Sequence, residues 1–467
     1  MLFTTFNFLG FFIVVFCVFW LLPRQRLRLA WLVVASLFFY GSWSVKLLFL
    51  LLATATFTYL VGLLLESTTS PHWRKAFLGF AIVVNLGILG FFKYANFALD
   101  NVFHLLRAAG MADRSPVVAV LLPLGISFYT FELVSYLVDI YRRRIPAQRD
   151  VLHYALYVLF FPRLVAGPIV RPDEFFPQLG KFALPDWDRA QVALQLILLG
   201  LFQKAVLADH LGLAIDPVFA DPASFASLSV WLAMVGYALQ IYCDFAGYSA
   251  MALGMARLLG FRLPVNFRMP YFSADIAEFW HRWHVSLSRW IRDYVYIPLG
   301  GSRGGPWMTA RNVFLTMTLC GLWHGAGWTF ILWGAYHGAL LALHRAVPRP
   351  NWWSSPLLRP LHVGTTFLCC VLGWVLFRAS TLADAGLIYR RMLSPVSGAT
   401  VDGVVVFTVC GISLLLLACH VLADRVSLVR LERRLPAFAL GGGLVVLLLL
   451  CQLLMPMSGH VFIYFQF

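Results

Sequence analysis

Runs of about 20 mostly apolar residues recur from one end of the chain to the other, and this feature constrains the fold more than any other. Of the 467 residues, 61% are hydrophobic and 12% are charged, whereas a soluble globular protein carries about 25% charged residues. A chain of this composition cannot cover a water-facing surface with polar side chains. The sequence therefore predicts an all-α, polytopic integral membrane protein.

The basic residues fall mainly in short loops between the apolar runs. The chain has 36 Lys and Arg against 21 Asp and Glu, a net charge of +15. Basic loops set membrane topology and contact anionic lipid head groups, so this distribution argues against a nucleic-acid partner. Arg24, Arg26 and Arg28 follow the first apolar run, and basic loops recur every two spans, near Arg74 and Arg142. This alternation places the N-terminus on the outer face of the membrane.

The apolar runs predict about 10–12 helices in a single domain, residues 1–467. The predicted spans are Phe6–Leu22, Ala30–Tyr40, Leu47–Leu65, Ala76–Phe92, Val117–Ile140, Ala190–Ala208, Leu228–Leu253, Val313–Leu322, Trp328–Leu343, Leu361–Leu376, Val404–Leu422 and Leu440–Leu454. Residues 157–172 contain Pro162, Gly167, Pro168 and Pro172, which predict a broken or re-entrant segment buried among other helices. The eight cysteines form no CxxC pair, so no metal site is predicted.

Residues 273–305 predict an amphipathic helix at the membrane interface. Asp275 followed by Glu278 fits a helix N-cap with an acidic third residue. At 100° per residue, one face collects Trp280, Trp283, Leu287, Trp290, Ile291 and Tyr294, and the other collects His281, Arg282, Ser288, Arg289 and Arg292. His284 lies at the edge of the apolar face. Two interpretations stay open: a membrane-surface anchor, or arginines that also bind a phosphate-bearing substrate from the cytoplasm.

Residues 313–343 form a run of 31 residues without a charged side chain, which is too long for one straight span of about 20 residues. Gly321, Gly325 and Gly327 surround His324, so we expect the run to break or to pack backbone against backbone there. An ionisable residue at membrane depth is a candidate functional site. The alternative is a neutral histidine that ties two helices together. For His337, in a more regular helix, that structural interpretation is favoured.

A third polar cluster lies in residues 238–254, where Gln240, Tyr242, Asp244, Tyr248 and Ser249 interrupt an apolar run. Asp244 is the ionisable member, whose burial within a membrane span costs free energy, so it is expected to face a cavity or to pair with a neighbour. It could orient a histidine, bind part of a substrate or serve a structural hydrogen bond. Glu132 and Asp139 raise the same question.

The sequence has none of the motifs of soluble enzymes: no GxSxG elbow, Walker loop, dinucleotide fingerprint or HExxH. A buried neutral histidine can take a proton from a hydroxyl near neutral pH, which suits the transfer of an acyl group from a thioester to a hydroxyl. Buried Asp and His also mark the pathways of transporters, so a transporter, a lipid-flipping protein or a scaffold of a polysaccharide export complex are the rival interpretations.

Five motifs, in order along the chain, resemble those of one family: FFPRLVAGPIVRP, QIYCDFAGYSAMALG, LPVNFRMPYFS, RWHVSLSRWIRDYVYIPLGGSRGG and LWHGAGWTFILWGAYHG. The resemblance is to the membrane-bound O-acyltransferase superfamily, in its bacterial alginate O-acetylation branch. It covers about residues 122–345, flanked by N-terminal helices in 1–121 and C-terminal helices in 346–467. Arg163 is one departure, because a Gln or another polar residue is expected at that position.

The resemblance implies a helical bundle that encloses a funnel or tunnel, with His324 as the catalytic residue and His284 as the second histidine near the tunnel. His324 would act as general base on the acceptor hydroxyl, and a transient acyl-histidine is the alternative. The further residues expected to bind substrate are Trp323, Asp244, Tyr248, Arg282, Arg289, Arg292, Asn266, Trp328 and His337.

The resemblance also implies the substrates and the location. The expected reaction moves acetyl from acetyl-CoA, a substrate rather than a permanently bound cofactor, toward an extracytoplasmic polysaccharide such as alginate. Peptidoglycan and cellulose are the alternative acceptors. A periplasmic partner resembling SGNH hydrolases is expected to complete the transfer. The protein is expected in the bacterial inner membrane, in contact with its lipids and with a periplasmic N-terminus.

Overall fold

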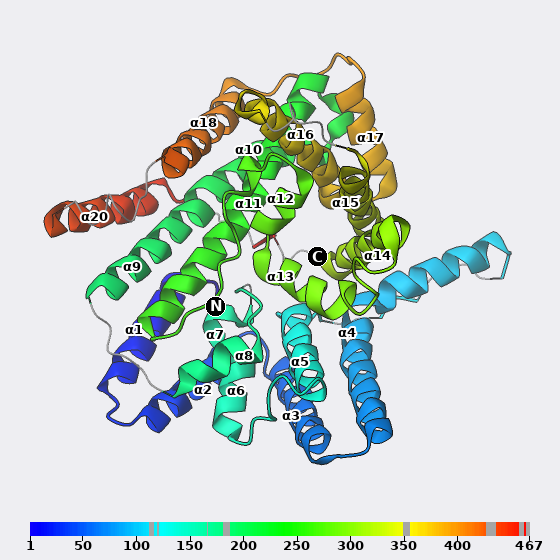
Figure 1. Cartoon of the computed structure of the whole chain (residues 1–467). Helices are drawn as coiled ribbons and strands as arrows, with labels where there is room; N and C mark the ends of the chain where they lie inside the picture. The colour runs from blue at the N-terminus through cyan, green and yellow to red at the C-terminus, as the bar shows by residue number, and fades with distance from the viewer. Residues whose placement is uncertain are drawn as a thin grey trace. The chain divides into compact units, whose positions relative to one another are not determined.

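The structure, a computed structural model, describes residues 1–111, 116–118, 121–165, 167–180, 187–348, 355–425, 436–456 and 462–463. The described residues are almost entirely helical and contain no named strand; one isolated bridge joins Phe225 and Ala399. This confirms the all-α prediction (Figure 1). The chain divides into two compact units, residues 1–193 with 252–264 and residues 194–251 with 265–467. The prediction of a single domain is not tested further.

Unit 1 contains the N-terminal helices and a broken segment. Its helices are α1 (Phe6–Leu21), α2 (Gln25–Gly41), α3 (Val45–Ser67), α4 (Pro71–Ala108), α5 (Ile126–Tyr141), α6 (Val151–Leu159), α7 (Phe161–Leu164), α8 (Pro172–Phe175) and the 3-10 helix η1 (Phe176–Leu179). The boundary between the units falls within α9 (Trp187–Leu201) and α11 (Ser227–Leu258).

Unit 2 contains the predicted catalytic motifs. Its elements are η2, a π-helix (Phe202–Ala208), α10 (Asp209–Ala220), η3 (Pro222–Ser224), η4 (Pro270–Phe272), α12 (Ile276–Arg282), α13 (Val285–Ile291), the π-helix η5 (Arg292–Tyr296), α14 (Gly305–His324), α15 (Trp328–Ala346), η7 (Pro356–Leu358), α16 (Arg359–Arg378), α17 (Leu382–Leu393), α18 (Gly403–Arg425) and α20 (Ala437–Leu454).

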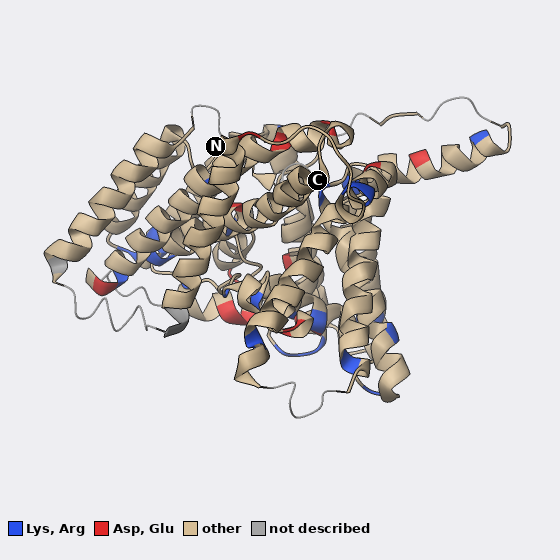
Figure 2. Ribbon diagram, turned by 90° about the horizontal axis from the view of Figure 1, so that it is seen from above, with Lys and Arg blue, Asp and Glu red and all other residues tan. Residues whose placement is uncertain are grey.

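By length and composition, six helical segments of the described chain can cross a membrane: Val45–Ser67, Pro71–Ala108, Trp187–Ala220, Ser227–Leu258, Pro356–Arg378 and Gly403–Leu422. The helices α1 and α20 are shorter and also apolar. Long stretches of ribbon carry no charged residue (Figure 2). These features confirm a multi-pass membrane protein, while the inner membrane and the periplasmic N-terminus stay predictions.

Several predicted spans differ in extent from the helices. The helix α4 has 38 residues, much longer than the predicted Ala76–Phe92, and α5 begins only at Ile126. Residues 119 and 120 of the predicted span Val117–Ile140 lie outside the described residues. The predicted span Ala190–Ala208 covers most of α9 and the π-helix η2, and α10 continues the helical segment beyond residue 208. Apolar character alone does not mark where a helix ends, since caps and turns decide that.

The predicted break in residues 157–172 is confirmed. The helix α6 stops at Leu159, and the four-residue helices α7 and α8 each have a proline in their first turn, where its missing N–H costs nothing. Residue 166 lies outside the described residues. An added Cβ at Gly125, which has φ 69°, would lie 2.3 Å from the carbonyl oxygen of Leu164, so glycine permits this close approach.

Arg163, the departure from the family pattern, has a structural role in unit 1. Its guanidinium forms an ion pair with Glu132, and both side chains are almost completely buried. The guanidinium carbon also lies 4.9 Å from the ring centre of Tyr157 and 5.0 Å from that of Phe175. A buried charge persists only when it is paired, so Arg163 and Glu132 explain each other's presence in the apolar interior.

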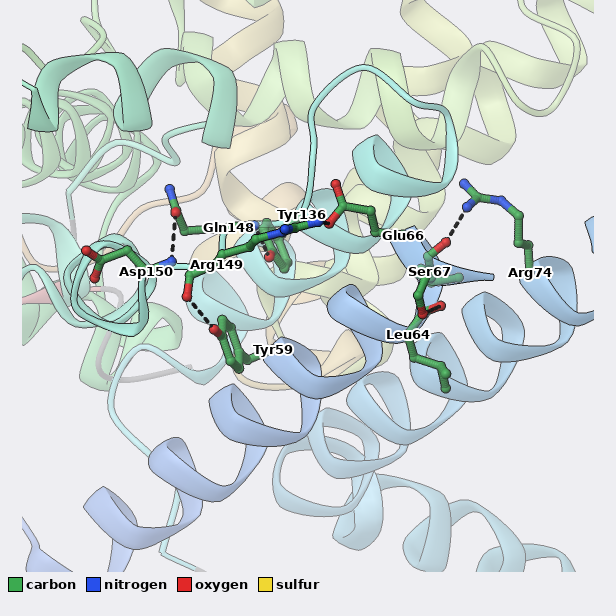
Figure 3. A network of polar contacts seen from close by, with 10 residues as sticks. Tyr59, Leu64, Glu66, Ser67, Arg74, Tyr136, Gln148, Arg149 and Asp150 are labelled. Atoms are coloured by element: carbon green, nitrogen blue, oxygen red, sulfur yellow. Dashed lines mark hydrogen bonds and ion pairs between the residues drawn. The ribbon is translucent and has the colours of Figure 1, made fainter. Parts of the chain in front are cut away.

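Arg74 joins the ends of two helices. Its guanidinium donates hydrogen bonds to the carbonyl oxygens of Leu65 and Thr68 at the end of α3, and to those of Ile140 and Tyr141 at the end of α5. Its relative exposure is 6%. Nearby, the carboxylate of Glu66 pairs with the exposed Arg149 at 3.7 Å (Figure 3). Arg74 thus caps carbonyls that lack helical partners, so it is more than a loop charge that sets topology.

We predict that Arg74→Ala lowers the stability of the purified protein by several kcal/mol, because hydrogen bonds to a charged group contribute about 1.5–3 kcal/mol each and the carbonyls would lose them together. Thermal unfolding in detergent measures the effect. Arg149→Ala is the matched control, since its side chain is 84% exposed and an exposed ion pair contributes about 0–1 kcal/mol. Equal melting temperatures for the two variants would contradict the capping role.

Candidate active site

The uncharged run of residues 313–343 folds as a helical hairpin that turns at His324. The helix α14 ends at His324, Gly325 and Gly327 are extended, and α15 begins at Trp328. The predicted break is therefore confirmed. His324 ends the first arm of the hairpin, and its side chain has 3% relative exposure.

Glycines let the two arms of the hairpin touch through their backbones. An added Cβ at Gly321 would lie 2.1 Å from the carbonyl oxygen of Phe330, and one at Gly334 would lie 2.2 Å from that of Met317. One at Gly338 would lie 2.9 Å from the Cα of Phe314. Any side chain at Gly321 or Gly334 would push the arms apart. The close packing of small residues fixes the position of the turn and of His324.

Aromatic rings enclose His324. Its ring centre lies 4.8 Å from that of Trp323, 5.0 Å from that of Trp333 and 5.3 Å from that of Phe377 of α16. Three elements therefore hold the imidazole: both arms of the hairpin and α16. Bulky neighbours with few rotamers fix its orientation, which a catalytic base requires.

The second histidine, His284, lies at a kink rather than within one amphipathic helix. The prediction of one amphipathic helix in residues 273–305 is wrong: α12 ends at Arg282, α13 begins at Val285, and His284 between them has φ 44°. The N-cap prediction is confirmed, because the Asp275 carboxylate accepts hydrogen bonds from the backbone N–H groups of Ala277 and Glu278. The two predicted faces also survive the kink, with the apolar members buried or half-buried and His281, Arg289 and Arg292 exposed.

Asn266 holds the kink. Its carbonyl oxygen accepts the N–H of Val285 at 2.9 Å, and its Oδ1 accepts the hydroxyl of Ser286 at 2.6 Å. Its Nδ2 donates to the Oγ of Ser249 on α11 at 3.2 Å. A non-glycine residue in the left-handed region costs about 1–3 kcal/mol, and these bonds offset that cost. Asn266 thereby positions His284; its predicted contact with substrate stays a prediction.

Trp323 lies between the two histidines. Its ring centre is 6.2 Å from that of His284 and 4.8 Å from that of His324. Phe245 packs edge-on against His284 from α11 at 4.7 Å. His284 is fully buried, and burial lowers its pKa to about 3. The structure therefore brings both predicted histidines into one aromatic cluster and keeps His284 neutral at physiological pH.

His337 belongs to the same cluster and contacts Trp333, the residue that also contacts His324. Its ring centre lies 4.9 Å from Trp333 and 5.3 Å from Trp280, and an added Cβ at Gly373 of α16 would meet its Nε2 at 2.9 Å. Among the described residues, neither ring nitrogen of His337 has a hydrogen-bond partner, and the same holds for the indole N–H groups of Trp280 and Trp333. Buried polar groups normally have partners, so this polar group of three side chains is a candidate contact for a substrate.

A cavity of about 220 Å³ lies between α12, α13, η5, α14 and α15. Arg289, Arg292 and Arg345 line it, and so does Trp280. Cys320 also lines it and precedes His324 by one helical turn on α14. The cavity thus has basic residues in its wall and reaches Trp280, whose ring contacts those of Trp333 and His337. Arg282 is not among the lining residues and pairs with Glu278 at 2.6 Å.

Asp244 lies in a buried charge cluster that the sequence predicted only in part. Its Oδ1 lies 2.7 Å from the Nζ of Lys204, which in turn lies 2.6 Å from the Oδ1 of Asp209. The expectation that Asp244 pairs with a neighbour is confirmed. The lysine was missed, although a charge inside the predicted span Ala190–Ala208 was the signal that could have revealed it.

The same carboxylate holds a segment from the C-terminal end of the chain. The Oδ2 of Asp244 accepts the backbone N–H of Ile463 at 2.7 Å. The ring of Phe462 packs 4.3 Å from Tyr248 and 5.8 Å from Phe245, the residue that contacts His284. Tyr248 is thereby placed beside the site, with 1% exposure. No sequence pattern pointed to Phe462 and Ile463.

Trp328 is the one predicted aromatic residue of this region that is largely exposed. It begins α15, and 51% of its surface is exposed, so it is not enclosed by the cluster of His284, Trp323 and His324. Its predicted contact with substrate is not tested by the structure.

Comparison with known proteins finds a matching family and several similar relatives. The sequence model of MBOAT, the membrane-bound O-acyltransferase family, matches residues 119–349. A probable alginate O-acetylase from Pseudomonas aeruginosa is 41% identical over 404 residues, which are 84% of this chain and 75% of the relative. A peptidoglycan O-acetyltransferase from Helicobacter pylori is 37% identical, over 78% of this chain and 73% of the relative. A teichoic acid D-alanyltransferase from Streptococcus thermophilus is 33% identical, over 48% of this chain and 57% of the relative.

We predict that Gly334→Val abolishes activity, because its side chain would meet the backbone of α14 and move His324. Acyl transfer in isolated membranes, normalised to the amount of inserted protein, measures the effect. Gly79→Val in α4 is the control: an added Cβ there has no neighbour within 4 Å, and the substitution costs no packing. Full activity of the Gly334→Val variant would show that the hairpin contact does not position the site.

We predict that His337→Phe leaves thermal stability unchanged or raises it while acyl transfer falls at least about tenfold. Replacing a buried polar group that lacks a partner by an apolar group of similar shape is close to neutral for stability. Melting temperature and transfer rate are measured on the same preparation. Unchanged transfer would assign His337 to packing alone.

Proposed function

The chain belongs to the membrane-bound O-acyltransferase family, and we propose that it moves an acetyl group from acetyl-CoA on the cytoplasmic side of the bacterial inner membrane to an extracytoplasmic polysaccharide. Family membership makes it an enzyme that transfers an acyl group to a hydroxyl. Two relatives named for O-acetylation match over most of the chain, whereas the D-alanyltransferase matches about half of it. We therefore propose acetyl as the cargo and an alginate-type polymer as the acceptor, with peptidoglycan as the alternative.

The single observation that carries the mechanism is that His324, inside the aromatic cluster, lies one turn of α14 beyond Cys320, which lines a cavity whose wall contains three arginines. Arg289, Arg292 and Arg345 would bind the phosphates of CoA, since a guanidinium donates paired hydrogen bonds to phosphate oxygens. The thioester would then extend past Trp280 toward His324. Trp280 lines the cavity, and its ring centre lies 5.7 Å from that of Trp333, which contacts His324, so this pair would line the passage.

The reaction needs one base and one leaving group. His324 takes the proton of the acceptor hydroxyl while the hydroxyl oxygen attacks the thioester carbonyl. The carbon–sulfur bond breaks, and the protonated imidazole returns the proton to the departing thiolate of CoA. Trp323 and Trp333 hold the ring in place, and His284, which is fixed by the kink and contacts Trp323, would orient the donor or the acceptor.

A separate periplasmic protein resembling SGNH hydrolases is the proposed route from this enzyme to the polymer. The basis is the family resemblance of the motifs around His284 and His324. In this scheme the hydroxyl that is acetylated beside His324 belongs to an intermediate acceptor at the outer face. The partner then transfers the acetyl group from that ester to the sugar hydroxyl, and the first acceptor leaves as the free hydroxyl.

We predict that His324→Ala lowers acetyl incorporation at least about 100-fold, since a positioned general base contributes about 10²–10⁴-fold to rate. The measurement is the acetyl content of the secreted polymer from cells that lack the wild-type gene, with membrane insertion confirmed. His72→Ala, at the exposed start of α4, is the control. Full acetylation by the His324→Ala variant would overturn the enzyme mechanism, and lost polymer export with intact acetyl content would favour a scaffold.

We predict that Arg289→Gln with Arg292→Gln raises the KM for acetyl-CoA at least about tenfold and changes kcat little, because phosphate contacts far from the thioester supply binding that is equal in ground and transition states. The control donor is an acetyl thioester of pantetheine, which has no nucleotide phosphates. Its KM should be the same for both proteins. An equal rise in the KM of both donors would show that the arginines do not bind the phosphates, which would leave the membrane-anchor interpretation of these residues.

A further inference from the structure

A second cavity in unit 2, of about 630 Å³, has no role in the proposed reaction. It lies between α11, η4, α16 and α18. Its wall is mostly apolar and includes Leu239, Val363, Phe367, Leu416, Leu417 and Val421. The volume falls in the range of about 300–1,000 Å³ that small-molecule sites occupy. It is large enough for a hydrocarbon chain.

The surroundings of this cavity determine what can enter it. The helix α18 is a candidate membrane span, and only 11% of its most apolar window is buried within the protein. Most of α18 therefore faces the hydrocarbon of the bilayer. Of the residues with which it lines the cavity, Leu416 and His420 are buried, whereas Leu417 and Val421 are exposed. The medium next to the cavity is lipid, so the natural occupant is a lipid chain.

One charged side chain lies in the wall. Arg359 is exposed at the start of α16, between Pro356 and Pro360, which line the same cavity. An arginine at the end of a membrane span attracts anionic head groups. An apolar chamber with a guanidinium at the end of one of its helices is complementary to an amphiphile with a hydrocarbon chain and a phosphate.

The cavity also shares a wall with the active site. Tyr271 lines it, and the hydroxyl of Tyr271 accepts a hydrogen bond from the indole N–H of Trp374 at 3.0 Å. Its ring centre lies 5.9 Å from that of Trp283, the residue before His284. Trp374 in turn packs 5.8 Å from Trp333, which contacts His324. An occupant of the cavity would contact Tyr271, which packs against Trp283 and Trp374 at the edge of the aromatic cluster.

We infer that this cavity binds one anionic phospholipid, with an acyl chain between α16 and α18 and the phosphate at Arg359. The bound lipid supports Tyr271, which lines the cavity and packs against Trp283. The inference does not depend on the identity of the acyl donor or acceptor, because it rests on the cavity and on Arg359 alone.

Gly364 offers a direct way to fill the cavity. It lines the cavity from α16, and an added Cβ there meets no atom within 4 Å. Gly364→Trp would therefore occupy the space without clashing with the backbone, and Gly364→Ala is the matched control that adds one methyl group. Arg359→Gln removes the charge and leaves the cavity open.

The test is native mass spectrometry of the purified full-length protein after equilibration with equal amounts of phosphatidylglycerol and phosphatidylethanolamine. We expect the wild-type protein and Gly364→Ala to retain one phosphatidylglycerol, and Gly364→Trp to retain at least about tenfold less. Arg359→Gln should keep a lipid but lose the preference for phosphatidylglycerol. Wild-type protein without lipid, or Gly364→Trp with as much as the wild type, would overturn the site; equal retention of both lipids by the wild type would overturn the anionic head group.

A second measurement does not depend on any variant. Phosphatidylglycerol with a photoreactive group in its acyl chain is cross-linked to the wild-type protein, and the labelled peptides are identified. Labelling concentrated in residues 359–367 and 413–421 supports the cavity as the site. Labelling spread evenly over the lipid-facing helices would mean that the lipid is only part of the surrounding bilayer.

Discussion

The direct backbone contact between α14 and α15 is the constraint on which the site depends. At Gly321 and Gly334 the two helices approach so closely that a side chain on either glycine would overlap the opposite backbone. In a lipid environment, where the hydrophobic effect between helices is weak, such close packing is a main source of helix association. It fixes the turn, and the turn fixes His324 at the end of α14.

A second device fixes the other histidine. At the kink between α12 and α13, His284 adopts a left-handed backbone conformation, and the hydrogen bonds of Asn266 offset the free-energy cost of that conformation. The hairpin and the kink meet at Trp323, whose ring contacts both imidazoles. Two short irregularities in the helices, rather than long regular segments, therefore bring the two histidines together in one aromatic cluster.

The sequence predicted the structure correctly at several positions where a residue type is energetically unfavourable in its surroundings. Glycines around a histidine in an uncharged run predicted the turn at His324, and prolines predicted the break between α6 and α8. The kink at His284 was missed because a helical periodicity persists on both sides of it. The partners Lys204 and Ile463 of Asp244 were also missed, since they lie 40 and 219 residues away and no local pattern connects them.

The central claim is that His324 meets the thioester of a CoA molecule whose phosphates lie at Arg289 and Arg292. The most direct measurement is an experimental structure of the protein in membrane mimetic with CoA bound, and the distance from the CoA sulfur to the imidazole of His324. The account predicts contact distance, about 3–4 Å, with reacting atoms at the separation that near-attack geometries require. A pantetheine arm that ends elsewhere, with the aromatic cluster closed around His324, would contradict it.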